Sequence, residues 1–110
     1  MNEELLERAA GRSVDPERLL PGEQRDLRST RCADAEHWVG VYSELIAFKV
    51  DVRQRTEAAL TTICENARPE VQNDLLVMLA EETRLVNRYE FWNERLRLLS
   101  APPPPGHTPT

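Results

Sequence analysis

The fold is decided by residues 69–99, which read PEVQNDLLVMLAEETRLVNRYEFWNERLRLL. Apolar side chains recur here at alternating steps of four and three residues, the spacing of a helix that packs along one partner. Pro69 suits the first turn of a helix, and Glu70 suits the positive end of its dipole. The repeat has one charged member and forms a continuous seam: Val71, Leu75, Met78, Glu82, Leu85, Tyr89, Trp92, Leu96 and Leu99. We therefore predict a helix over about 70–99.

A second seam with the same spacing precedes the first. Its members are Trp38, Tyr42, Leu45, Lys49, Val52, Thr56, Ala59 and Ile63. Asp34 is a plausible N-cap, and no proline interrupts the following stretch, so we predict a helix over about 34–66. Two seams joined by so short a connection must run antiparallel. The sequence thus predicts an all-α protein whose core, residues 33–100, is a long coiled-coil-like helical hairpin.

The two charged seam residues bear on the register of this hairpin. When the seams are paired outward from the turn, Lys49 and Glu82 fall in adjacent layers on opposite helices. A partly buried ion pair adds little net stability but penalises wrong registers. We therefore predict that Lys49 and Glu82 set the register, with Arg53 as an alternative partner for Glu82.

The flanking segments have a different character. Residues 1–32 are broken by prolines and glycines, and we expect only short helical pieces there, over about 2–11 and 15–20. Residues 101–110 are rich in proline and should form a disordered, extended tail.

The hairpin carries more apolar surface than two seams can hide. The residues beside the seams include Val39, Ile46 and Leu60, then Val41 and Phe48, and on the other helix Leu79, Val86, Val77, Phe91 and Leu98. Such a wide apolar face is typical of a bundle of more than two helices. Either two hairpins dimerise or the N-terminal segment folds back over the face. We favour the homodimer, because twofold dimers are the commonest oligomers, although the two arrangements are compatible.

All six aromatic residues gather at the end of the hairpin away from the turn. The commoner role of such a cluster is an aromatic core. The alternative is a groove for a partner helix, since Trp and Tyr are frequent anchors of interfaces. The candidate interaction residues are Trp38, Tyr42, Phe48, Val77, Tyr89, Phe91, Trp92 and Leu98.

Composition and motifs exclude several functional classes. The net charge is -5 and no basic stripe emerges, which argues against nucleic acid as a partner. The acidic start and the short apolar runs argue against a secretory signal or a membrane span, so we expect a cytoplasmic protein. Phosphate-binding loops, Cys-x-x-Cys pairs and the common hydrolase motifs are missing, so we expect neither an enzyme nor a cofactor. Thirteen arginines accompany a single lysine, Lys49, which is typical of a GC-rich bacterial genome.

We therefore expect a non-enzymatic helical interaction or adaptor module that binds itself, another protein, or both. One alternative is a regulator of the transcription machinery, because the acidic tip is similar in general shape to that of factors entering the secondary channel of bacterial RNA polymerase. The tip residues concerned are Glu65, Glu70 and Asp74. A less favoured alternative is a carboxylate metal-binding bundle, in which the residues at sevenfold spacing would be His37, Glu44 and Asp51. The chain has no Glu-x-x-His, and a solvated acidic face explains these residues more simply.

Overall fold

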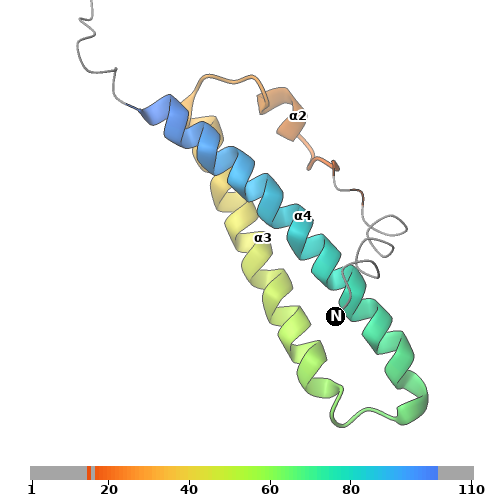
Figure 1. Cartoon of the computed structure of the whole chain (residues 1–110). Helices are drawn as coiled ribbons and strands as arrows, with labels where there is room; N and C mark the ends of the chain where they lie inside the picture. Colours follow the sequence, from red (N-terminus) through yellow and green to blue (C-terminus); the bar gives the residue numbers. More distant parts are fainter. Residues whose placement is uncertain (1–14, 16, 102–110) are drawn as a thin grey trace, which may run out of the picture.

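The computed structural model describes Asp15 and residues 17–101, and this part of the chain is all-α (Figure 1). Two long helices, α3 (Cys32–Ala59) and α4 (Arg68–Ser100), run antiparallel and pack along their length. A short 3-10 helix, η1 (Glu65–Ala67), joins them, and one helical turn, α2 (Glu23–Asp26), precedes α3. The predicted all-helical hairpin is confirmed. The helix expected over 2–11 and the tail over 102–110 lie outside the described residues.

The two long helices differ in how well their ends were predicted. α4 is slightly longer than the predicted 70–99, and Pro69 lies in its first turn. α3 ends at Ala59 rather than near residue 66. The hydroxyls of Thr61 and Thr62 donate to the carbonyls of Ala58 and Ala59, at 2.9 and 3.1 Å. These local bonds compete with a continuing helix and close α3 early.

The start of α3 also differs from the prediction. The helix begins at Cys32, after an extended Arg31, so Asp34 lies inside the first turn and is not the N-cap. Its carboxylate accepts a hydrogen bond from the Ser29 hydroxyl at 2.5 Å. Asp34 therefore ties the start of α3 to the segment before it.

The helical piece expected at 15–20 is wrong. The Asp15 carboxylate accepts the main-chain N–H of Glu17 at 3.0 Å, and the described residues of this stretch, 15 and 17–20, form a turn and irregular chain. The single helical turn α2 lies instead directly after Gly22, whose φ of 87° is the left-handed conformation that glycine adopts without strain. The chain therefore makes a tight turn at Gly22 before α2 begins.

Residues 17–31, here called the arm, fold back against the hairpin. Three arginines of α4, here called the arginine ladder, each hold a successive point of the arm. Arg84 donates to the carbonyl of Arg18 at 3.0 Å, Arg88 to the carboxylate of Glu23 at 3.0 Å, and Arg95 to the carbonyl of Ser29 at 2.8 Å. The bonded residues are 65 or 66 positions apart each time, so the arm runs parallel to α4. Fold-back of the N-terminal segment is thus present, whereas dimerisation stays a prediction.

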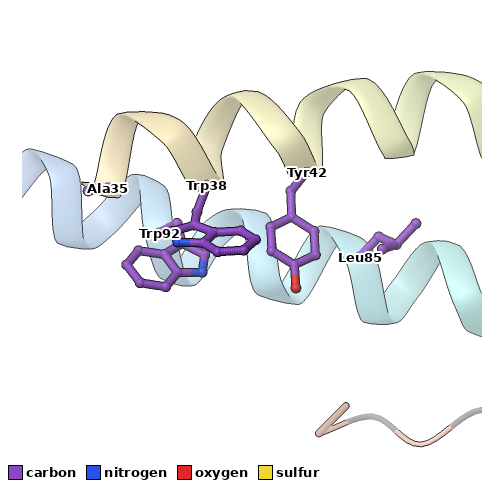
Figure 2. Packing of buried hydrophobic residues seen from close by; sticks show 5 residues of the cluster. All are labelled: Ala35, Trp38, Tyr42, Leu85 and Trp92. Atoms are coloured by element: carbon purple, nitrogen blue, oxygen red, sulfur yellow. The ribbon is translucent and has the colours of Figure 1, made fainter. Parts of the chain in front are cut away.

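The core lies toward the end of the hairpin away from the turn. Its buried members, shown in Figure 2, are Ala35, Trp38, Tyr42, Leu85 and Trp92. The rings of Trp38 and Trp92 stack with centroids 6.1 Å apart and 24° between their planes. Leu20 and Leu27 of the arm pack against this cluster and are half-buried. Both seams and the arm therefore contribute to one core.

The ion pair across the hairpin uses the alternative partner. The carboxylate of Glu82 binds the guanidinium of Arg53, not the ammonium of Lys49. Arg53 also binds Glu57 at 2.7 Å on its own helix. Counted outward from the turn, Arg53 lies in the layer of Glu82, whereas Lys49 lies one turn closer to the aromatic end. The ion pair thus joins the helices in their shared layer.

Candidate interaction site at the aromatic end

Glu23 of the arm places a carboxylate in the core, where its side chain is 0% exposed. One oxygen, Oε1, accepts the N–H of Leu20 at 2.9 Å and the hydroxyl of Tyr42 at 2.5 Å. The other, Oε2, accepts the indole N–H of Trp92 at 2.7 Å and two N–H groups of Arg88, at 3.0 and 2.5 Å. Both oxygens are thus saturated with donors. We call the three hairpin side chains that bind this carboxylate, Tyr42, Arg88 and Trp92, the cradle.

Asp26 repeats the arrangement three residues later. Its Oδ2 accepts the indole N–H of Trp38 at 2.9 Å, and its Oδ1 lies 3.4 Å from Nε of Arg25. A buried indole needs an acceptor for its N–H. Each tryptophan of the hairpin therefore finds its acceptor on α2.

The surroundings keep both carboxylates ionised at neutral pH. Burial alone would raise the pKa of Glu23, but the hydrogen bonds from Tyr42, Trp92, Leu20 and Arg88 outweigh it and lower that pKa. The bond from Trp38 lowers the pKa of Asp26, against a smaller effect of burial. Both groups therefore act purely as acceptors.

Tyr42 remains the donor in its bond to Glu23. Burial, together with the neighbouring Glu23, raises the pKa of Tyr42 to about 12. The phenol is consequently protonated across the whole physiological range and presents its O–H to the carboxylate.

The eight predicted interaction residues do not form one surface. Three are buried in the core: Trp38, Tyr42 and Trp92. Two are half-buried, Val77 and Tyr89, and Tyr89 packs against the core. Three are exposed: Phe48 at 62%, Leu98 at 60% and Phe91 at 39%. The aromatic cluster is thus mainly a core that the arm covers, and the open apolar surface lies around it.

Two of the exposed residues, Phe91 and Leu98, lie beside the arm. Each follows an arginine of the ladder by three residues, so it occupies the adjoining strip of the α4 surface. The guanidinium of Arg88 lies 4.6 Å from the centroid of the Phe91 ring, and that ring meets Trp92 edge-on. We call Phe91 and Leu98 the edge strip.

Two more apolar residues of the hairpin are exposed, Phe48 of α3 at 62% and Val86 of α4 at 37%. Phe48 and Arg88 each directly precede a seam residue of their helix, whereas Val86 directly follows one. In an antiparallel pair, residues that precede the two seams share one side of the hairpin. Phe48 therefore lies on the side of the ladder, nearer the turn than Arg88, and Val86 lies on the other side.

Sequence reasoning missed the acids that complete this site. Glu23 and Asp26 lie next to Arg25 and Arg28, and the sequence pattern predicted no role for them in the core. A signal was nevertheless present: the seams contain two indoles and two phenols, and no carboxylate or amide side chain lies on either seam at the aromatic end to accept from them. Acids just upstream of the first seam were the nearest candidates for that role.

The alternative sites gain no support from the described geometry. Among residues 15 and 17–101, no three His, Cys, Asp or Glu side chains are grouped to hold a metal ion. The tip acids Glu65, Glu70 and Asp74 are exposed, as expected for charges near the start of a helix. No helix in the described part of the chain has the length and apolarity to cross a membrane.

Comparison with known proteins gives no relative from which a function could be transferred: no protein-family model, curated protein or solved structure matches the chain.

Proposed function

We propose that this chain is a non-enzymatic cytoplasmic interaction module that self-associates through the Phe48 ring of α3. The observation that carries the proposal is the exposure of this ring, which is 62%. The ring stays exposed although the arm is docked on the hairpin. A second copy would supply the missing layer and complete a four-helix bundle. Cys32 and Cys64 are both free thiols, which suits a reducing compartment.

A single exposed ring suits a symmetric pair. In a twofold dimer the same patch meets itself, and residue i contacts j while j contacts i. An axis beside Phe48 brings the two Phe48 rings of the dimer together. Because every contact occurs twice, one substitution removes two phenylalanine rings from the interface.

The test is the oligomeric state in solution. Sedimentation velocity of the wild-type chain, the Phe48→Ser variant and a matched Leu98→Ser control would be compared over a wide concentration range. Leu98 is exposed to 60% but lies on the edge strip. We expect a dimer for the wild type and for Leu98→Ser, and at least about tenfold weaker association for Phe48→Ser. A wild type that stays monomeric at millimolar concentration, or equal loss in both variants, would reject the proposal.

A further inference from the structure

We infer that the cradle is a recognition site for an acidic helix of another protein, one with a Glu and an Asp three residues apart, and that the arm occupies it as an internal ligand. This inference concerns residues other than the proposed dimer contact Phe48 and does not depend on self-association. It rests on which groups of the arm the hairpin contacts.

The hairpin recognises few features of the arm that are particular to this chain. Arg84 and Arg95 bind main-chain carbonyls, which any polypeptide offers. The arm side chains that it contacts through hydrogen bonds are two carboxylates one helical turn apart, Glu23 and Asp26, and the hydroxyl of Ser29. Residues at this spacing lie on the same face of a helix. A segment with the pattern Glu-x-x-Asp in helical form therefore presents the same groups.

The arm is also built to be displaced. α2 is a single turn of four residues, far too short to be stable without its contacts. Two leucines of the arm, Leu20 and Leu27, pack on the core, and both are only half-buried. The remaining contacts are polar, and buried polar pairs add specificity more than net stability. Closure of the arm thus depends mainly on polar contacts and on few apolar ones.

An outside helix gains contacts that the arm cannot make. Ser29 lies opposite Arg95, and the chain then turns into α3 at Cys32, so the arm leaves α4 before Leu98. A continuous helix on the same path would cover Leu98 and Phe91. The tethered arm competes at an effective concentration on the order of millimolar, and burial of the edge strip is what allows a separate chain to displace it.

The first experiment uses a peptide with the sequence of residues 15–31 as the probe, labelled for fluorescence anisotropy. A twin peptide carries Gln and Asn in place of the two acids. Each is titrated into the full-length wild type and into a variant with Leu20→Ala and Leu27→Ala, which loosens the internal arm but leaves the cradle intact. We expect the variant to bind the acidic peptide at least about tenfold more tightly than the wild type does. The twin should bind neither protein.

Several outcomes would overturn the inference. One is that the double-leucine variant, shown to be helical by far-ultraviolet circular dichroism, binds both peptides equally or binds neither of them. Another is equal affinity of wild type and variant, which would mean that the arm does not compete. If the double-leucine variant fails to fold, Glu23→Gln with Asp26→Asn in the full chain provides the weakened arm, and the same criteria apply.

Additional variants separate this site from the dimer contact. Arg88→Gln in the loosened variant should lower the affinity for the acidic peptide at least about tenfold, whereas Phe48→Ser should leave it unchanged. A dimer that persists in Phe48→Ser and disappears in Glu23→Gln would show that a second copy exchanges its arm. That result would replace the acidic partner by a second copy of this chain.

Discussion

Glu23→Gln is the substitution that most directly tests the cradle. The change keeps the shape of the side chain but removes its charge and replaces one acceptor oxygen by an amide with two N–H donors. All the groups around it, from Tyr42, Arg88, Trp92 and the N–H of Leu20, are donors. At least one donor must then face another donor, and Arg88 loses its counter-ion.

The magnitude follows from burial. Glu23 is 0% exposed, and the side chain of Arg88 is 16% exposed. Removing one partner of a buried ion pair costs about 3–5 kcal/mol. Because the arm can detach and return its groups to water, the loss is limited by the free energy of undocking. We therefore expect the free energy of unfolding to fall by about 3 kcal/mol, near the lower bound for such pairs.

The assay is thermal unfolding followed by circular dichroism and by tryptophan emission at neutral pH. A loss of about 3 kcal/mol lowers the melting temperature of a domain this size by roughly 12–24 °C. Emission should also shift to the red at room temperature, since both indoles lose their carboxylate acceptors when the arm leaves. Glu17→Gln is the matched control, because Glu17 belongs to the same arm and is exposed, and its effect should stay within about 0.5 kcal/mol. Equal melting temperatures for Glu23→Gln and Glu17→Gln would refute the reasoning.

Two other expectations follow from the same structure. In the folded state the pKa values of Glu23 and Asp26 are lowered from their ordinary values of 4.5 and 3.8. The two carboxylates therefore contribute their full stabilisation above the ordinary values, and this stabilisation is lost as the pH falls through the lowered pKa values of the folded state. Tryptophan emission should therefore shift to the red on acidification below about pH 4, and an unchanged spectrum there would contradict the assigned bonds. Among the glycines, Gly40→Ala should raise stability by about 0.5–1 kcal/mol, because Gly40 is inside α3 and an added Cβ meets nothing within 4 Å. Gly22→Ala should instead lower the stability by about 1 kcal/mol, because the φ of 87° is strained for alanine. Urea denaturation of the two variants measures both changes, and a more stable Gly22→Ala or a less stable Gly40→Ala would contradict them.

Periodicity was sufficient to predict the hairpin. The seam of α4 contains no exposed residue from Val71 to Leu99, because a heptad repeat leaves little choice of buried face. The periodicity did not predict the end of α3. Ala59 and Ile63 continue the spacing, but the hydroxyls of Thr61 and Thr62 close the helix through local bonds that a hydrophobic pattern does not register.

Only half of the candidate site could be predicted from the sequence. The indoles and Tyr42 could be placed at one end of the hairpin, since their positions follow from the seams. Their acceptors could not, because a glutamate on a four-residue turn carries no periodic signal and resembles its solvated neighbours. The burial of Glu23 depends on a contact with Trp92 that spans 69 residues, and only the folded chain brings these two together.

The pairing of the arm with α4 also has a consequence for the order of folding. Contacts near the turn join residues close in the chain, whereas each bond of the ladder closes a loop of 65 or 66 residues. Loop closure costs more entropy the longer the loop is. The contacts of the hairpin should therefore form from the turn outward, and the arm should dock after them. During synthesis Glu23 emerges long before Arg88 and Trp92, and it remains in water until they follow. Glu23, one of the most deeply buried side chains of the protein, is therefore expected to be among the last to reach its place.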